Sequence, residues 1–183
     1  MNYKIRIENI VASGSLGIQV PLQKIVSKVE GTEYEPEQFP GLVLRMNNPK
    51  SAALIFSSGK IVCTGTRTQK DLKKALKRIV SVLRSSSIKV PSKFNFRIEN
   101  IVSSTKLNAR IDLDKVAFEM ENSEYEPEQF PGLVLRFKNP NVAFLLFGSG
   151  KIVCTGARKT KDVKIAINRL VKELKSIGAI IKE

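Results

Sequence analysis

The segment EYEPEQFPGLVLR, residues 33–45, decides the fold because the chain contains it twice. Residues 124–136 repeat all of it without a substitution, 91 positions further along the chain. Two identical segments at a fixed offset indicate two copies of one structural unit. The sequence is therefore expected to build the same module twice.

The repeat extends well beyond this segment. Other pairs at the same offset are the Asn-Ile-Val segments at residues 9–11 and 100–102 and the Ser-Gly-Lys segments at residues 58–60 and 149–151. An offset that stays constant over most of the chain predicts two direct repeats, residues 1–91 and 92–183. A polar stretch from Ser85 to Ser92, which contains a proline near its end, is expected to join them.

Each repeat shows a mixed α and β pattern. In the first repeat, strands are expected at residues 4–11, 42–46, 52–56 and 61–64, with a Ser-Ser-Gly-Lys turn between the last two. A short helix is expected to begin at Pro21, and Asp112 is expected to cap its copy. A longer helix with a basic outer face closes each repeat. Its predicted apolar stripe is Leu72, Ala75, Leu76, Ile79, Val80 and Leu83, matched by Val163, Ala166, Ile167, Leu170, Val171 and Leu174.

The predicted sheet has two apolar faces. Two helices per repeat can cover one face, which takes alternate residues such as Ala53, Ile55, Ile61 and Cys63. The opposite face should then be polar, but its residues are largely apolar: Leu54, Phe56, Val62 and Thr64, with their copies Leu145, Phe147, Val153 and Thr155. An uncovered apolar face indicates a ligand or a protein partner, and an ordinary dimer or sandwich interface is the alternative.

Composition favours a polyanionic partner. The chain has 31 Lys and Arg against 17 Asp and Glu, so its net charge is +14 and its pI is about 9.9. Nucleic acid is the usual partner of such a chain, and a solvated, Lys-rich, heat-tolerant surface is the alternative. No apolar run approaches the roughly 20 residues that a bilayer requires, and no signal peptide is visible. We expect an intracellular protein without a membrane partner: cytoplasmic and DNA-associated, or nuclear if the source is eukaryotic.

Catalysis and metal binding have little support in the sequence. The chain has no His, which removes the Ser-His and Cys-His nucleophile pairs and the His metal sites. Cys63 and Cys154 lie in apolar strand patterns and are expected to be core residues rather than metal ligands or a disulfide. We therefore predict a protein that is not an enzyme and that has neither cofactor nor metal.

Several motifs, taken in order, resemble the core of the TATA-box-binding protein family, particularly its archaeal form. They are IENIV at residues 7–11 and 98–102, EPEQFPGLVLR at residues 35–45 and 126–136, and SGKIVCTG at residues 58–65 and 149–156. The resemblance spans nearly the whole chain. It implies an α+β fold, a pseudo-two-fold saddle with a curved ten-stranded antiparallel sheet, and four helices on the convex face.

The resemblance also implies a general transcription initiation factor that binds the minor groove of A·T-rich TATA elements in double-stranded promoter DNA. Phe39 with Phe56, and Phe130 with Phe147, match the wedges with which the family unstacks base steps, kinks the duplex and bends it. Asn9 and Asn100 match central asparagines that face base-edge acceptors, with Thr64 and Thr155 beside them. The matching groove floor is Val11, Leu54, Val62, Val102, Leu145 and Val153. Because A·T and T·A show nearly the same minor-groove acceptors, this chemistry selects A·T over G·C.

Candidate phosphate contacts are Arg45, Ser58, Lys60, Arg136, Ser149 and Lys151. By resemblance, Glu126 and Glu128 match positions at which the family meets transcription factor B, through which RNA polymerase joins the initiation complex. The first repeat carries identical residues, Glu35 and Glu37, but residues 1–91 have 15 basic and 6 acidic groups, net +9, against net +5 for the rest. The factor is therefore expected on the less basic second repeat.

Two other functions stay open on the sequence alone. A platform for single-stranded RNA or DNA would also use aromatic residues on a sheet. A protein-interaction module would use the apolar face for self-association, which is also compatible with DNA binding if the same surface is hidden without DNA.

Overall fold

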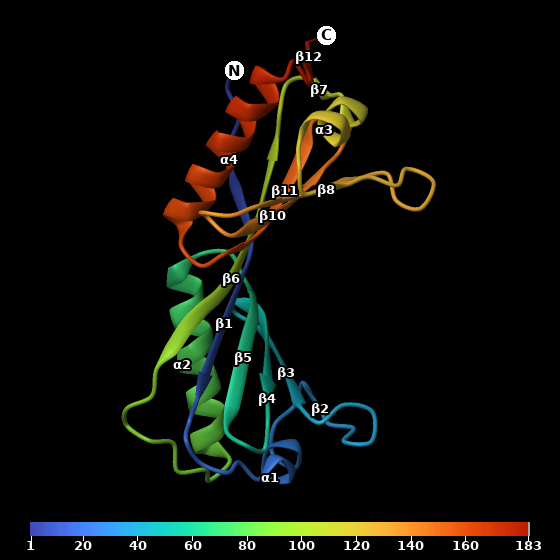
Figure 1. Ribbon diagram of the computed structural model, residues 1–183. Helices are drawn as coiled ribbons and strands as arrows, with labels where there is room; N and C mark the ends of the chain where they lie inside the picture. The colour runs from blue at the N-terminus through green and yellow to red at the C-terminus, as the bar shows by residue number, and fades with distance from the viewer. Residues whose placement is uncertain (183) are drawn as a thin grey trace. The chain divides into compact units, whose positions relative to one another are not determined.

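The computed structural model describes residues 1–182, which contain four helices and twelve strands (Figure 1). The elements of the first repeat are β1 (Arg6–Ser15), α1 (Leu22–Val26), β2 (Thr32–Glu33), β3 (Leu42–Asn47), β4 (Lys50–Ile55), β5 (Lys60–Thr66) and α2 (Gln69–Ser85). Those of the second are β6 (Phe96–Lys106), β7 (Arg110–Ile111), α3 (Leu113–Glu119), β8 (Ser123–Glu124), β9 (Leu133–Phe137), β10 (Val142–Leu146), β11 (Lys151–Ala157), α4 (Thr160–Ser176) and β12 (Ile180–Ile181).

Ten of these strands form the antiparallel sheet, and β7 pairs with β12 in a separate two-stranded sheet. The strand order is β2-β3-β4-β5-β1 in the first repeat and β6-β11-β10-β9-β8 in the second. The predicted α+β class, with a ten-stranded antiparallel sheet and four helices, is therefore confirmed.

The chain folds into two compact units. The N-unit comprises Asn9–Glu99, and the C-unit comprises Met1–Glu8 together with Asn100–Glu183. The first residues of β1 consequently pack within the C-unit, where the Thr105 hydroxyl donates a hydrogen bond of 2.8 Å to the carbonyl of Lys4. The division of the sequence into repeats 1–91 and 92–183, with its hinge, stays a prediction.

In the N-unit, helices cover one face of the strands. The side chains of Ala53, Ile55, Ile61 and Cys63, which alternate along β4 and β5, are completely buried, as predicted. The covering helix α2 runs along β5 and β1 (Figure 1). It begins where the Thr68 side chain accepts a hydrogen bond of 3.0 Å from the backbone N–H of Asp71, a standard N-cap.

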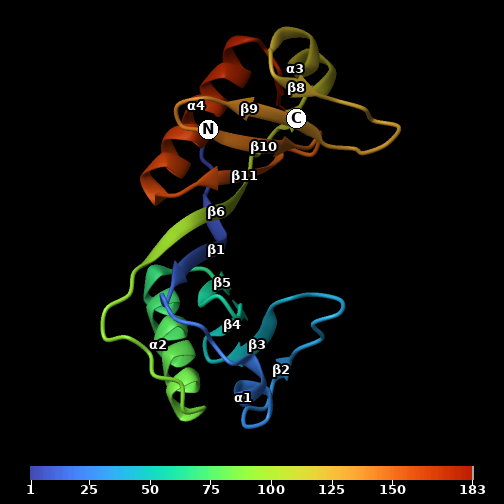
Figure 2. The ribbon, with the colours of Figure 1, turned by 60° about the horizontal axis from the view of Figure 1, so that its bottom comes forward.

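The C-unit repeats this arrangement, with different buried side chains on β10 and the same ones on β11. Phe144, Leu146, Ile152 and Cys154 are completely buried, and α4 lies beside β9, β10 and β11 (Figure 2). All six predicted apolar residues of α4 are buried. Asp112 caps α3 by accepting a hydrogen bond of 3.1 Å from the N–H of Lys115, which confirms the prediction.

Some element limits differ from the sequence prediction. β1 begins at Arg6 and continues to Ser15, whereas the alternating pattern indicated residues 4–11. The apolar stripe of α2 turns toward Val82, which is buried, while Leu76 and Val80 are only half-buried. The two-residue strands β2, β7, β8 and β12 were not predicted, because two residues are too few to show a period.

One buried hydroxyl offers a test of the packing. Thr66 is only 2% exposed, and its Oγ1 has no hydrogen-bond partner among residues 1–182. The equivalent position of the second repeat is Ala157, which is also buried. Because a buried hydroxyl without a partner costs about 1–3 kcal/mol, we expect Thr66→Val to raise the free energy of unfolding by about 1 kcal/mol. Chemical denaturation measures it, and Thr68→Val, which removes a helix cap, should lower the same quantity.

Candidate nucleic-acid interface

The second face of the N-unit strands carries a continuous ladder of paired residues. Val43 of β3 lies opposite Leu54 of β4, Leu54 lies opposite Val62 of β5, and Val62 lies opposite Ser13 of β1. All four side chains are half-buried, in contrast to their completely buried neighbours along the strands. The ladder is therefore an apolar surface that no helix of the N-unit covers.

The C-unit presents the same ladder with equivalent residues. Val134, Leu145, Val153 and Ser104 pair in the same order across β9, β10, β11 and β6. We call the two ladders and the residues around them the uncovered faces. Val11 and Val102, the remaining predicted floor residues, are half-buried beside them on β1 and β6. Val43 and Val134 were missed, although each lies two positions before a predicted phosphate contact, Arg45 or Arg136, on the same side of its strand.

The two asparagines have a fixed amide orientation. In the N-unit, the Oδ1 atom of Asn9 accepts a hydrogen bond of 2.7 Å from the backbone N–H of Gly65. Its Nδ2 atom donates to Oγ1 of Thr64 at 2.9 Å. Because a backbone N–H can only donate, it identifies the oxygen side of the amide, and the Asn9 amide keeps a second N–H for another acceptor.

Asn100 repeats this geometry in the C-unit. Its Oδ1 accepts from the N–H of Gly156 at 2.7 Å, and its Nδ2 donates to Oγ1 of Thr155 at 3.0 Å. The predicted pairing of each asparagine with its threonine is thus present in the structure.

Glycine makes these hydrogen bonds to Asn9 and Asn100 possible. Gly65 and Gly156 have φ angles of +103° and +106°, which side-chain-bearing residues rarely adopt. A Cβ atom at Gly65 would lie 3.0 Å from Cα of Ser51. The pairing of β1 with β5 shifts register between Ile10 and Ala12, whose partners are Thr66 and Cys63, so the extra residue lies on β5 in the stretch that contains Gly65. SGKIVCTG ends in this glycine, although the sequence did not reveal its role.

Each unit holds a pair of phenylalanines at a loop end of its uncovered face. Phe39, in the loop from β2 to β3, is 42% exposed, and its ring centroid lies 5.9 Å from that of Phe56, in the turn from β4 to β5. The planes meet at 69°, an edge-to-face arrangement. Phe130 and Phe147 repeat the arrangement in the C-unit at 6.0 Å and 73°. Both predicted pairs are therefore brought together.

A glycine lies beneath each ring pair. A Cβ atom at Gly41 would approach Cε1 of Phe39 to 2.8 Å and Cε1 of Phe56 to 3.0 Å. Gly132 would meet Phe130 and Phe147 in the same way. The Phe-Pro-Gly sequence therefore leaves the rings their space and holds them at the surface.

The predicted phosphate contacts are exposed in both units. Arg45, Ser58 and Lys60 lie on β3, in the β4–β5 turn and at the start of β5, and Arg136, Ser149 and Lys151 occupy the equivalent places. Arg45 lies 3.6 Å from Glu33, but both side chains are about two-thirds exposed, so water weakens this ion pair. In the C-unit, Nζ of Lys106 donates a hydrogen bond to the carbonyl of Ser149, which adds a basic residue that the sequence analysis missed.

Two carboxylates beside the floors were also missed. In the N-unit, Glu99 accepts hydrogen bonds of 2.7 Å from the Ser13 hydroxyl and from Nε of Arg97, and together with Val62 these residues line a shallow hollow. In the C-unit, Ser104 donates to Glu8 at 2.7 Å. The alternation along β1 and β6 indicates which face carries Ser13 and Ser104. It does not indicate their partners, because each carboxylate lies on the other strand: Glu99 on β6 and Glu8 on β1.

The carboxylate of Glu99 should oppose a polyanion on the uncovered face. We expect Glu99→Gln to raise the affinity for a duplex by about threefold to fivefold, on the order of 1 kcal/mol, because one repulsive charge is removed while Ser13 keeps an acceptor. Fluorescence anisotropy at several salt concentrations measures this affinity. Glu30→Gln, an equal change of charge at an exposed loop residue, is the control. An unchanged or lower affinity for Glu99→Gln would contradict an anionic ligand at this place.

The loops between β2 and β3 and between β8 and β9 project from the strands (Figure 1). Glu126 and Glu128 are exposed in the second of these loops, as Glu35 and Glu37 are in the first. The carbonyl of Glu126 accepts the backbone N–H of Phe130 at 3.0 Å, so the backbone rather than the acidic side chains shapes the turn.

The cysteines take no part in the uncovered faces. Cys63 and Cys154 are completely buried in their units, which confirms the prediction that they are core residues. Burial raises the pKa of both thiols to about 11, so they stay protonated near neutral pH. Within residues 1–182, no group of three or more His, Cys, Asp and Glu is placed to hold a metal ion, and no helix is long and apolar enough to span a membrane.

Comparison with known proteins gives one consistent family. The family model described as transcription factor TFIID, or TATA-binding protein, matches the chain twice, at residues 4–86 and 95–177. The TATA-box-binding protein of Methanobrevibacter smithii is 48% identical over 176 residues, 96% of this chain and 97% of that protein. That of Archaeoglobus fulgidus is 47% identical over 179 residues, 97% of this chain and 98% of that protein.

A solved structure agrees with these sequences. The TATA-binding protein of Methanococcus jannaschii superimposes with a TM-score of 0.86 at 42% identity, covering 94% of this chain and 99% of that one. The match confirms the predicted fold of this family, and the two matched segments confirm the internal repeat.

Proposed function

The chain belongs to the TATA-binding protein family, and on that premise we propose that it binds the minor groove of A·T-rich promoter DNA on its uncovered faces and bends the duplex. Membership places it among transcription factors rather than enzymes. In the proposed role, it starts assembly of the initiation complex on the promoter.

The single observation that carries the proposal is the locked amide of Asn9 and of Asn100. Each amide oxygen accepts a glycine N–H at 2.7 Å and each amide nitrogen donates to its threonine, so each NH2 group keeps one N–H as a further donor. The minor groove of an A·T pair presents only acceptors, A N3 and T O2. Two fixed donors on an apolar floor are complementary to that groove.

The floor supports discrimination by exclusion. A G·C pair adds the guanine N2 amino group, a donor, to the minor groove. Above Leu54 and Val62, or Leu145 and Val153, that donor would be buried without a partner, at a cost of about 1–3 kcal/mol. The same floor can pack against the acceptor edges of A·T pairs without such a cost. Selection of A·T therefore follows from both the donors and the apolar side chains.

The phenylalanine pairs account for bending in this proposal. Phe39 and Phe130 are exposed at a loop end of each uncovered face, with Phe56 and Phe147 half-buried beside them, and a flat apolar ring there can enter between two base pairs and replace lost stacking. Unstacking costs on the order of a few kcal/mol per step, and wedges of this kind are the mechanism known for the family. Flexible TA steps lower that cost, so the protein would also select sequences that are easy to deform.

The direct test is energy transfer between fluorophores at the two ends of a short TATA duplex. A duplex of about 20 base pairs is nearly straight without protein, because the persistence length of DNA is about 150 base pairs. We expect the full-length chain to raise transfer on the TATA duplex and not on a G·C-rich duplex of equal length. Unchanged transfer on both would overturn the proposal, and preference for single strands in competition would favour a single-strand platform instead.

The proposed protein partner is transcription factor B, bound through the β8–β9 loop, with RNA polymerase joining afterwards. Glu126 and Glu128 are exposed there beside the proposed DNA site, so they suit a basic partner. Self-association through the uncovered faces when DNA is absent is part of the same proposal, since the apolar ladders have no cover within either unit.

Charge reversal tests the choice of loop. We expect Glu126→Arg with Glu128→Arg to abolish the ternary complex with transcription factor B in a gel-shift assay while binding of the TATA duplex is retained. The backbone hydrogen bond from Phe130 to Glu126 should preserve the turn in this variant. Glu35→Arg with Glu37→Arg makes the same change in the identical loop of the N-unit. Equal loss in both variants would refute assignment to the second repeat.

A further inference from the structure

The exposed side of α2 carries a stripe of basic residues that the uncovered faces do not use. We propose that this stripe is a second, sequence-independent binding surface for the phosphate backbone of duplex DNA. The basic stripe consists of Lys70, Lys73, Lys74, Lys77, Arg78 and Arg84. It lies on the opposite side of the N-unit strands from the uncovered face, so its binding does not require a duplex there.

The basic stripe has no intramolecular partner. All six side chains are exposed, and within residues 1–182 none of them forms an ion pair or a side-chain hydrogen bond. The helix contains one acidic residue, Asp71, in its first turn. The charges are therefore available to an external anion.

Folding does not explain the arrangement. Lys70 and Lys74, Lys73 and Lys77, and Lys74 and Arg78 are spaced four residues apart, so like charges are neighbours on the helix surface. Each such pair destabilises a helix by about 0.2–0.5 kcal/mol. A basic surface that serves only solubility would instead be expected to intersperse charges of both signs.

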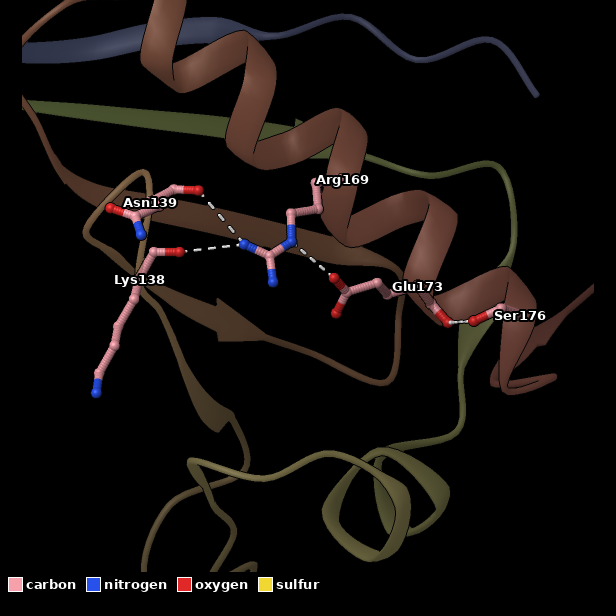
Figure 3. A network of polar contacts seen from close by, with 5 residues as sticks. All are labelled: Lys138, Asn139, Arg169, Glu173 and Ser176. Carbon is pink, nitrogen blue, oxygen red and sulfur yellow. Dashed lines mark hydrogen bonds and ion pairs between the residues drawn. The ribbon is translucent and has the colours of Figure 1, made fainter.

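The second repeat provides an internal comparison. α4 keeps Lys161, Lys164 and Lys175 where α2 has Lys70, Lys73 and Arg84, but Ile165 and Asn168 stand where α2 has Lys74 and Lys77. The counterpart of Arg78 is Arg169, and Figure 3 shows that its guanidinium is occupied. It contacts Glu173 at 2.7 Å and donates to the carbonyl of Lys138 at 3.1 Å. The same fold thus forms with fewer free cations on this helix, which indicates that the additional charges of the basic stripe serve another purpose.

Distance separates the basic stripe from a duplex on the uncovered face. A helix with its side chains is about 10–12 Å thick, whereas the screening length at physiological ionic strength is about 8 Å. The outer charges of α2 therefore add little to binding on the other side of the sheet.

The composition of the stripe favours nucleic acid over protein. Protein interfaces are depleted in Lys and anchored by aromatic residues, whereas this surface has four Lys, two Arg and no aromatic side chain. The 17 residues of α2 span about 25 Å, and duplex DNA presents a phosphate about every 1.7 Å along its axis. A partner that needs only regular negative charge meets these conditions.

The experiment measures binding of a second duplex to the full-length chain saturated with an unlabelled TATA duplex. The probe is a fluorescein-labelled, G·C-rich duplex, followed by anisotropy over a salt series. The test variant is Lys74→Gln with Lys77→Asn and Arg78→Gln. The control, Lys161→Gln with Lys164→Gln and Lys172→Gln, removes the same number of charges from α4.

We expect the test variant to weaken binding of the probe at least tenfold and the control to change it less than twofold. Each lost phosphate contact should also reduce the slope of log K against log salt by about 0.9. The test variant relieves repulsion, so its thermal unfolding should be unchanged or shifted upward, which separates lost binding from lost folding. Equal weakening by the two variants, or none, would overturn the proposal. Preferential binding of polyglutamate over the probe would overturn it in favour of an acidic protein partner.

Failure of the proposed TATA binding can be distinguished from failure of binding at the basic stripe. The TATA duplex is titrated first by energy transfer, and the probe is also titrated without it. Loss of TATA bending with retained binding of the probe to α2 would overturn the proposed function and leave the basic stripe supported.

Discussion

Replacing Phe56 and Phe147 by alanine should remove most of the rise in energy transfer that the TATA duplex shows with the unaltered protein. Each substitution takes away one ring of an edge-to-face pair and leaves the other, Phe39 or Phe130, without its neighbour. If the rings replace stacking at a kinked step, their removal leaves the unstacking cost of a few kcal/mol per step without compensation in the bound duplex. We expect affinity to fall at least 100-fold at constant salt, and transfer to stay near its protein-free value even when the duplex is saturated.

The control separates wedging from a general loss of aromatic surface. Phe118 on α3 is 88% exposed and lies on no strand of the sheet, so Phe118→Ala should leave transfer and affinity unchanged. The rings of Phe56 and Phe147 are only half-buried, and an aromatic pair contributes about 0.5–1.5 kcal/mol, so the double variant should still fold. Retained affinity and transfer in the double variant would show that the rings pack the surface and do not enter the duplex.

The sequence predicted the faces of the sheet well because the strand period is two and both faces of this sheet are apolar. Alternation placed Leu54 and Val62 on one side and Ile55 and Cys63 on the other, and the structure confirms both assignments. The exact repeat then transferred each assignment to the second half. The basic outer side of α2 was visible in the same way, since its apolar stripe recurs at helical spacing.

The details that fix the site were not predictable from the same patterns. The lock on Asn9 needs the N–H of Gly65, 56 positions away, and the positive φ of that glycine. Neither the register shift between β1 and β5 nor the pairing of Ser13 with Glu99 leaves a periodic signal. Such contacts depend on register between strands far apart in the chain, which propensity and alternation do not encode.

The hydrogen bonds from Gly65 and Gly156 also allow the sharpest test of base-edge recognition. A substitution can keep these bonds while it changes the amide donor into an acceptor. In Asn9→Asp with Asn100→Asp, each carboxylate can still accept from Gly65 or Gly156, and a charged acceptor strengthens that hydrogen bond. The NH2 group, however, becomes a second acceptor, which in the proposed complex would meet the acceptors of A·T pairs. We expect affinity for the TATA duplex to fall roughly 100-fold per site, about 3 kcal/mol each, with little change in thermal unfolding.

A charge-matched variant distinguishes lost donors from added negative charge. Asn108→Asp with Asn168→Asp adds the same two charges at exposed positions outside the ladders. It should lower affinity by no more than a few-fold, and less as salt rises, because screening acts on distant charges. The loss in the Asn9 and Asn100 variant should persist at high salt, since it comes from unpaired groups in direct contact with the bases. If both variants lose affinity equally and recover with salt, the amides contribute only to charge, and A·T selection must come from the apolar floor.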